Sequence, residues 1–338
     1  MTNWHQFIEQ ENQLPDAPAV AADASSGNFF SALTDLGLIA FEGDDAANFL
    51  HNQLTNDVEH LGLDEARLAG YCTPKGRLLA SFLMWRNAGT IVLELARDIQ
   101  PSIQKRLQMF VMRAKAKSTD ITESNAIIGL GGDAVGTALA SWFPLLPAAP
   151  YAKVENAAGT LIRLADAGAM ARYQWITTPE TAIAAWPQLK TTLHQAGTEQ
   201  WRLTEILAAV PHITLATQEK FVPQMVNLEA IGGVNFRKGC YPGQEIVARS
   251  QYLGKLKRRT MPASVSAAEV TAGMEVFAAG DQEQPCGMIV NAARDQTGLF
   301  HCLVEIKTAT LDSDTVHLGA QGPVLHFTAL PYALPDTV

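Results

Sequence analysis

The most chemically suggestive stretch of the chain has a cysteine at its centre: Arg237-Lys238-Gly239-Cys240-Tyr241-Pro242-Gly243-Gln244-Glu245-Ile246-Val247-Ala248-Arg249. Good helix formers follow the Pro-Gly turn, so the stretch predicts a loop that leads into a helix N-terminus. There the free backbone N–H groups, the helix dipole and the neighbouring Arg237 and Lys238 would favour a thiolate over a thiol. Cys240 is therefore a candidate reactive residue. The alternative is a small buried hydrophobic residue beside an ordinary turn.

Positive charge is concentrated around this cysteine, although the net charge of the chain is −9. One acid, Glu245, accompanies seven basic residues between positions 237 and 259: Arg237, Lys238, Arg249, Lys255, Lys257, Arg258 and Arg259. A second run without acids contains Lys105, Arg106, Arg113, Lys115 and Lys117. This distribution predicts an anionic ligand near Cys240, such as a polyglutamate tail or a phosphate backbone, and its alternative is two solvated basic faces.

Length and composition indicate an ordinary globular protein of two or three domains, with 338 residues, 47% hydrophobic and 17% charged. No apolar run is long enough to span a membrane, and no secretory signal begins the chain, so we expect a cytoplasmic protein. The overall negative charge argues against DNA as a partner. The four cysteines are Cys72, Cys240, Cys286 and Cys302, and their wide spacing predicts neither disulfides nor a self-contained metal site.

The elements that must position the cysteine can be outlined from the apolar pattern. Residues 11–28 are rich in Pro, Ala, Ser and Asp and predict an irregular leader, and removal of residues 1–20 is expected to leave the core folded. Leu36 to Phe41 predicts a buried strand, followed at once by a helix that Asp44 or Asp45 caps. The stripe of that helix would contain Phe49, Leu50, Leu54, Val58 and Leu61.

Further strands are predicted from 78 to 85 and from 90 to 95, and a helix from 99 to 110. From Met261 onward, short β-rich pieces alternate with turns and no convincing helix, as in a small β-barrel.

A glycine pattern in the middle of the chain resembles a dinucleotide-binding turn. Residues 126–134 place G-x-G-x-x-A after a predicted strand and before a predicted helix at 135–142. Only one β–α–β unit could be built here, and an Ala/Pro-rich loop interrupts it before Glu155. The pattern therefore favours a structural turn over a nicotinamide or flavin site.

The cysteine stretch, read as Lys-Gly-Cys-Tyr-Pro-Gly-Gln-Glu-x-Val-Ala-Arg, resembles the signature of the YgfZ-type folate-binding proteins, relatives of the glycine-cleavage T-protein (aminomethyltransferase). The resemblance is colinear over nearly the whole chain. It includes Gly43-x-Asp45-Ala46-x-x-Phe49-Leu50, the segments 53–58, 72–77, 201–213 and 221–228, and Leu330-Pro331-Tyr332.

The resemblance implies an α+β fold: a three-domain ring of the aminomethyltransferase type around a folate-sized channel, with a C-terminal β-barrel. The implied division is an irregular leader (1–28), a central folate-binding part carrying the cysteine (29–117 and 198–258), a second α+β domain (118–197) and the barrel (259–338).

The resemblance also implies tetrahydrofolate or a derivative as cofactor. The residues predicted to contact it are Trp201, Lys238, Gly239, Tyr241, Gly243, Gln244, Glu245 and Arg249. The indole of Trp201 could stack on a pterin ring, or it could be an ordinary core tryptophan.

Three positions depart from the family pattern, which bears on pterin recognition. Leu207 stands where the family has the glutamate that holds the pterin, and Ala209 where it has glycine. Leu36 replaces a frequent aromatic residue. Glu205 is close enough in sequence to be considered in place of the missing acid.

Two functions are consistent with these observations. The first is an accessory protein that binds tetrahydrofolate and uses Cys240 to support iron–sulfur enzymes or their assembly, including enzymes that modify tRNA. The second is a folate-dependent one-carbon transferase, for which the sequence shows no separate acid–base constellation. Direct contact with tRNA is a further possibility, although no RNA-binding module is recognisable.

Overall fold

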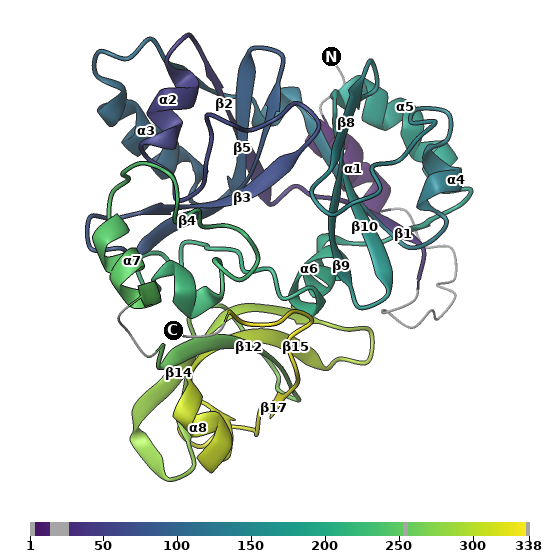
Figure 1. The fold of residues 1–338 in the computed structure, drawn as a ribbon. Coiled ribbons are helices and arrows are strands. Elements are labelled where there is room, and N and C mark those ends of the chain that lie inside the picture. The colour runs from purple at the N-terminus through teal and green to yellow at the C-terminus, as the bar shows by residue number, and fades with distance from the viewer. Residues whose placement is uncertain (1–3, 14–26, 253–255, 336–338) are drawn as a thin grey trace.

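The computed structural model describes residues 4–13, 27–252 and 256–335, which form three sheets surrounded by short helices (Figure 1). We call them the N-terminal, middle and C-terminal sheets. Within the described residues, no helix is long and apolar enough to cross a lipid bilayer.

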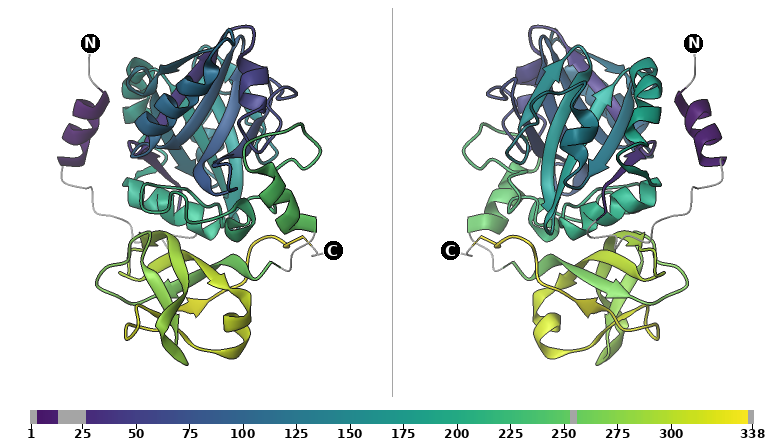
Figure 2. Two further views of the ribbon diagram at one scale, coloured as in Figure 1. Left: turned by 90° about the vertical axis from the view of Figure 1, so that its left-hand side faces the viewer. Right: turned by 90° about the vertical axis from the view of Figure 1, so that its right-hand side faces the viewer.

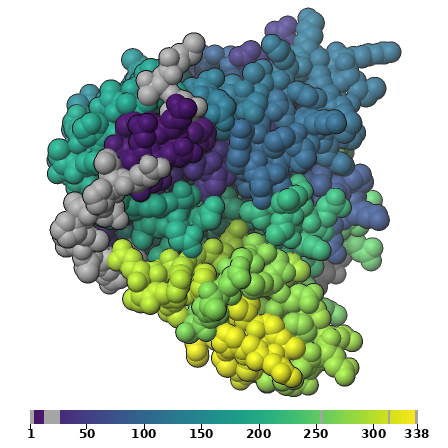
Figure 3. All heavy atoms as spheres, turned by 180° about the vertical axis from the view of Figure 1, so that it is seen from behind, coloured from purple at the N-terminus to yellow at the C-terminus, as the bar shows by residue number. Residues whose placement is uncertain are grey.

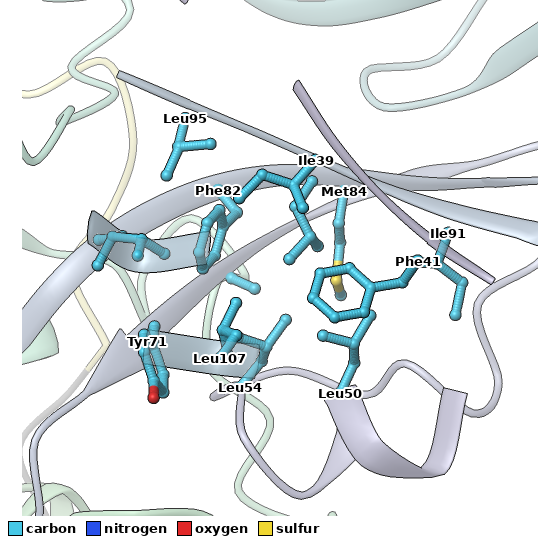
Figure 4. Close-up of a cluster of buried hydrophobic side chains, with 14 of the residues drawn as sticks. Ile39, Phe41, Leu50, Leu54, Tyr71, Phe82, Met84, Ile91, Leu95 and Leu107 are labelled. Carbon is cyan, nitrogen blue, oxygen red and sulfur yellow. The ribbon is translucent and has the colours of Figure 1, made fainter. Parts of the chain in front are cut away.

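The N-terminal sheet is antiparallel and has the order β3-β4-β5-β2-β6. Its strands are β2 (Leu36–Glu42), β3 (Ala66–Cys72), β4 (Leu78–Asn87), β5 (Thr90–Ala96) and β6 (Lys117–Asp120). The core lies on the face that α2 (Ala46–His51) and α3 (Gln100–Val111) cover. Figure 4 shows Phe41, Leu50, Leu54 and Leu107 gathered there. The strands predicted from 36, 78 and 90 and the helix predicted from 99 are confirmed.

The helix predicted to follow β2 is shorter than its apolar stripe suggests, because α2 ends at His51. Leu54, Val58 and Leu61 are buried all the same. Beyond α2 the backbone is held by β3 instead, since the amide of Thr55 donates to the carbonyl of Gly70 (2.9 Å). Asp45 does not cap the helix either: its carboxylate accepts a hydrogen bond from the amide of Lys115 (2.7 Å).

The middle sheet brings together strands that lie far apart in the sequence, in the order β11-β1-β7-β10-β9-β8. They are β1 (Phe29–Ala32), β7 (Ala126–Gly131), β8 (Lys153–Asn156), β9 (Gly159–Ala167), β10 (Met170–Thr177) and β11 (His194–Gln195). The helices α4 (Val135–Leu139) and α5 (Pro179–Leu189) and the 3₁₀ helix η1 (Thr122–Ser124) complete this part. β1 pairs with β11 and β7 of this sheet. The domain boundaries given above stay a prediction.

The glycine pattern of residues 126–134 is structural. It lies in β7 and the turn before α4, and β7 is antiparallel to both of its neighbours, β1 and β10. A dinucleotide-binding turn requires a parallel β–α–β unit. Gly129 instead allows the ring of Trp201 to approach the strand: a Cβ at this position would lie 2.4 Å from the indole.

The N-terminal residues differ from the predicted irregular leader, because Trp4–Gln13 form the helix α1. Trp4 and Ile8 are buried, and the indole of Trp4 packs edge-on against that of Trp186 at 5.4 Å. Figures 2 and 3 show α1 as an outlying helix on the surface of the middle-sheet part. Its removal would expose core surface, contrary to the prediction. The rest of the leader lies outside the described residues.

The C-terminal sheet has the order β16-β13-β14-β15-β12-β17 and curls as a small barrel does (Figure 1). Its strands are β12 (Arg258–Val265), β13 (Glu275–Ala278), β14 (Asp281–Arg294), β15 (Phe300–Lys307), β16 (Val316–Leu318) and β17 (His326–Phe327). One short helix, α8 (Thr308–Ser313), interrupts the predicted all-strand pattern.

Three elements remain, all in the segment between the middle and C-terminal sheets: α6 (Thr198–Leu207), the 3₁₀ helix η2 (Pro223–Val226) and α7 (Gln244–Tyr252). The first of them, α6, packs against β1 and β9 of the middle sheet and against β14 and β15 of the C-terminal sheet. It therefore lies where the sheets meet.

Candidate functional site

Two adjoining pockets open beside α6 and share Glu205, Val210 and His212 as lining residues. The outer pocket has a volume of about 720 Å³ and the inner one a volume of about 30 Å³. The outer volume falls in the usual range of small-molecule sites, whereas the inner pocket admits only the edge of a ligand. Its walls include apolar side chains of β3 and β4, among them Leu68 and Leu83.

Glu205 projects from α6 into both pockets. Its Oε1 accepts a hydrogen bond from the indole nitrogen of Trp201 (3.0 Å) and lies 3.1 Å from Nε2 of His212. Burial acts to raise the pKa of Glu205, but the charge and hydrogen bond of His212, the charge of Arg172 and the hydrogen bond from Trp201 together hold the pKa below its usual value. An ionised carboxylate is therefore fixed at the junction of the pockets.

The main chain of His212 is held in place by the side chain of Asn291. Its amide donates to Oδ1 of Asn291 in β14, and Nδ2 of Asn291 donates back to the carbonyl of His212 (both 2.9 Å). Burial acts to lower the pKa of the imidazole, but the neighbouring Glu205 raises it above its usual value. The pair therefore favours imidazolium and carboxylate at neutral pH.

A second carboxyl group, Glu94 of β5, lines the inner pocket and is only 3% exposed. Its Oε2 accepts a hydrogen bond from Nε2 of Gln174 in β10. Burial raises the pKa of Glu94 to about 8. The inner pocket thus holds an acid that stays largely neutral at pH 7 beside one that is ionised.

Trp201 is a core residue rather than an exposed stacking platform. It is 1% exposed, and the guanidinium of Arg172 lies 5.2 Å from its ring. Arg172 also donates to the carbonyl of Ala165 (2.8 Å) and to Oγ1 of Thr204 (3.2 Å), which fastens α6 to the middle sheet. Of the two alternatives for Trp201, the structure favours the core tryptophan, whose N–H orients Glu205.

Cys240 lies on the surface, in the loop before α7, and the other three cysteines are buried. Burial raises the pKa of both Cys72 and Cys302 to about 12. Among the four thiols, all of which belong to the described residues, the one with free access to solvent is therefore Cys240. It precedes the helix by several residues, so the predicted influence of the helix N-terminus acts from outside the first turn.

Lys238 connects this loop to the end of α2. Its ammonium group donates to the carbonyl of His51 and to that of Leu54 (2.7 Å), and it lies 4.9 Å from the ring of Tyr241. Burial lowers the pKa of Lys238 to about 8. Lysine is well suited to these carbonyls, because a helix C-terminus leaves them unpaired.

The other motif residues also have local roles. Tyr241 is buried. Gly243 has φ +82°, and a Cβ there would lie 2.5 Å from the carbonyl oxygen of Thr73. Gln244, Glu245 and Arg249 lie on α7, and Gly239 is exposed in the loop.

The predicted contact residues do not meet at these two pockets. Among the described residues, those that line the two pockets include neither Trp201 nor any motif residue from 238 to 249. Two basic residues of the run 237–259 form ion pairs within the protein: Arg258 pairs with Glu305 (2.8 Å) and Arg259 with Glu229.

Sequence reasoning missed Glu94, Gln174 and His212. The signal for Glu94 was its place within the apolar run 91–95, which predicts a buried strand. An acid in such a run is expected to be buried as well. No cluster of three or more potential metal ligands occurs in the part of the chain that the structure describes.

Comparisons with known proteins supply relatives for most of the chain. It is 32% identical over 253 residues to tRNA-modifying protein YgfZ of Pectobacterium carotovorum (73% of this chain, 74% of the relative). It is 29% identical over 309 residues to the protein of that name from Klebsiella pneumoniae (90% and 93%). No family model matches the chain.

Among solved structures, the chain resembles glycine cleavage system aminomethyltransferase T from Bartonella henselae. The TM-score is 0.70 at 14% identity, covering 93% of this chain and 89% of the other. This likeness confirms the predicted fold: an α+β architecture of the aminomethyltransferase type whose C-terminal sheet curls into a barrel-like unit.

Proposed function

Because the chain belongs to the family of tRNA-modifying protein YgfZ, we propose that it binds a reduced folate at the meeting point of its sheets. The bound protein supports iron–sulfur enzymes or their assembly, including enzymes that modify tRNA, and Cys240 is the reactive group in that role. The observation that carries the folate part is the fixed carboxylate of Glu205 at the junction of a ligand-sized outer pocket and a narrow inner one.

The residues present fit a folate. A pterin ring offers a row of N–H groups along one edge, and an ionised carboxylate such as Glu205 accepts hydrogen bonds from such a row. The apolar walls of the inner pocket, including Phe82 and Leu83, suit the edge of a flat ring. In the outer pocket, Arg97 and Arg202 are the side chains that could meet the carboxylates of the glutamate tail. Those carboxylates would compete with the ion pairs that Arg97 makes with Asp120 and Glu123 and that Arg202 makes with Asp35. Glu205 would thus hold the pterin in place of the family glutamate, whose position Leu207 takes in this chain.

Substituting Glu205 with glutamine tests the folate site. Glutamine keeps the size and an acceptor for Trp201 but removes the charge, so we expect tetrahydrofolate to bind about 10 to 100 times more weakly, since hydrogen bonds to charged groups contribute roughly 1.5–3 kcal/mol. Isothermal titration calorimetry under anaerobic conditions measures the dissociation constant. Glu180→Gln, an exposed helix carboxylate away from both pockets, is the matched control. Absence of saturable binding by the unmodified protein would refute the folate proposal.

The accessory role of Cys240 predicts a separation of functions. Iodoacetamide at pH 7.5 should label Cys240 first, because the other three thiols are buried and burial raises their pKa. Cys240→Ser should fold, bind folate as the unmodified protein does, and fail to support iron–sulfur enzymes in cells that lack the native gene. The labelling order is read by peptide mass spectrometry. A serine variant with full activity in cells would show that the thiol has no chemical role.

A folate-dependent one-carbon transferase is the second candidate, and one observation favours it. The structure places Glu94, Glu205 and His212 around the pockets, which supplies acid–base groups that the sequence did not reveal. Turnover of a methylene- or methyl-tetrahydrofolate with an amine or thiol acceptor distinguishes the two candidates, because the accessory reading expects binding without turnover.

A further inference from the structure

The hydrogen bond between Gln174 and Glu94 gives the two oxygens of this buried acid different roles. The side-chain amide of Gln174 donates to Oε2, which therefore serves as the carbonyl-type acceptor. A neutral carboxyl group has one O–H, so Oε1 is the oxygen left to donate. Glu94 pairs across the sheet with Leu38 and Leu83, and Leu83 is also a wall residue of the inner pocket.

The groups that act on Glu94 come from several elements. Burial raises its pKa to about 8; the charge of His212 and the hydrogen bond from Gln174 oppose this, and Glu205 and Asp35 add to it. Arg172 and Tyr151 also line the inner pocket. Since Glu205 has a lowered pKa, the two acids of the pocket are in opposite protonation states at pH 7.

We propose that Glu94 is a specificity residue, which acts as a neutral carboxylic acid and donates a hydrogen bond from Oε1 to a ring carbonyl of the ligand. This inference rests on the proposed folate site and defines its chemistry more closely. Glu205 accepts from N–H groups, and Glu94 donates to an acceptor. The pocket therefore selects a flat heterocycle that carries both N–H donors and a carbonyl oxygen, as a 2-amino-4-oxopyrimidine ring does. A ring with an amino group in place of the carbonyl would bind more weakly, because the amino group and the O–H of Glu94 are both hydrogen-bond donors.

The pH dependence of binding follows from the proton on Glu94. Below pH 8 the donor is present, so Glu94 adds no pH dependence to the affinity. Above pH 8 the acid ionises, and the affinity falls by up to about tenfold per pH unit, because one proton must be restored for binding. The probe is 5-formyltetrahydrofolate, a reduced folate that is stable in air, titrated calorimetrically from pH 6 to pH 9.5.

Two substitutions at the same position separate the donor from the packing. Glu94→Leu fills the space without a donor and should weaken binding at pH 7 by at least about tenfold. Glu94→Gln carries an amide donor that does not titrate, so it should restore most of the affinity and remove the fall above pH 8. The matched control is Glu42→Gln, an exposed glutamate on the neighbouring strand β2, which should keep the fall.

Infrared spectroscopy provides a readout that does not depend on folate. The difference spectrum between the unmodified protein and Glu94→Gln should show the carbonyl band of a protonated carboxylic acid at pH 7, which is lost as the pH rises through about 8. The subtraction removes the bands of other carboxyl groups whose pKa burial raises, such as that of Glu229. Absence of that band, or a fall in affinity that is as steep in Glu94→Gln as in the unmodified protein, overturns the inference and leaves folate binding intact. Failure of the unmodified protein to bind folate at every pH overturns the proposed function, and this inference with it.

Discussion

Replacing Arg259 with leucine is expected to lower the free energy of unfolding by about 3–5 kcal/mol, because the change leaves a buried carboxylate without its partner. Arg259 lies in β12, and its Nη1 donates to Glu229, to the carbonyl of Gln224 (2.9 Å) and to Oδ1 of Asn227 (3.4 Å). Burial raises the pKa of Glu229, and Arg259 opposes this shift. One side chain thus secures the C-terminal sheet to the segment that follows η2.

Urea denaturation at pH 7 measures the loss. The exposed neighbour Lys257→Leu is the control and should change the stability by less than about 0.5 kcal/mol. Adding Glu229→Leu to Arg259→Leu should recover most of the stability, because no charge is then left buried. In the single variant the unpaired Glu229 takes up a proton more readily, so its deficit should shrink as the pH falls from 7 to 5. A deficit under 1 kcal/mol would mean that the pair contributes little.

Gly129→Val is expected to destabilise the protein by about 3 kcal/mol or more and to weaken folate binding at the same time. A Cβ at this position would lie 2.4 Å from Cε3 of Trp201 and 2.7 Å from Cδ2, and valine adds two methyl groups beyond it. The indole has little room to move, because its N–H is bonded to Glu205 and Arg172 lies against its ring. Any shift of the ring displaces the carboxylate that we assign to the ligand.

The control for this prediction is Gly136→Ala in α4. The nearest atom to a Cβ there is 3.6 Å away, and alanine favours helices, so this variant should be as stable as the unmodified protein or slightly more so. Thermal unfolding measures the stability of both variants, and near-ultraviolet circular dichroism reports on the environment of their tryptophans. Unchanged melting of Gly129→Val would show that the strand and the indole are not in contact.

The parts of the fold that local sequence determines were predictable. The strand at 36–41, the helix at 99–110 and the helix after the Pro-Gly turn each carry their own apolar period or turn signal. The spacing of Leu54, Val58 and Leu61 led to a wrong helix prediction, because buried side chains at helical spacing were taken as evidence for a helix. Those side chains reach the core from a loop whose backbone is bonded to β3, a contact of tertiary origin.

The candidate site was harder to predict, because its members come from different elements. Glu205 was considered only as a neighbour of Leu207, and its side chain reaches the pocket because α6 turns that face toward the sheets. His212 follows α6 without regular structure and acquires its role from Asn291, nearly eighty residues later in the chain. Cys240 stood out from its motif. The role of Lys238 as a ligand contact stays a prediction, and the sequence did not reveal that its ammonium group donates to carbonyls at the end of α2.

The strand order of the middle sheet has a consequence for synthesis on the ribosome. All strands of the N-terminal sheet lie between residues 36 and 120, so that sheet is complete in a nascent chain of modest length. β1 emerges before any of them, yet its neighbours are β7 at 126–131 and β11 at 194–195. At typical elongation rates its second edge stays open for on the order of ten seconds or more. During that interval Phe29 and Phe30 form an apolar segment with unpaired backbone groups, the kind of sequence that chaperones of nascent chains engage.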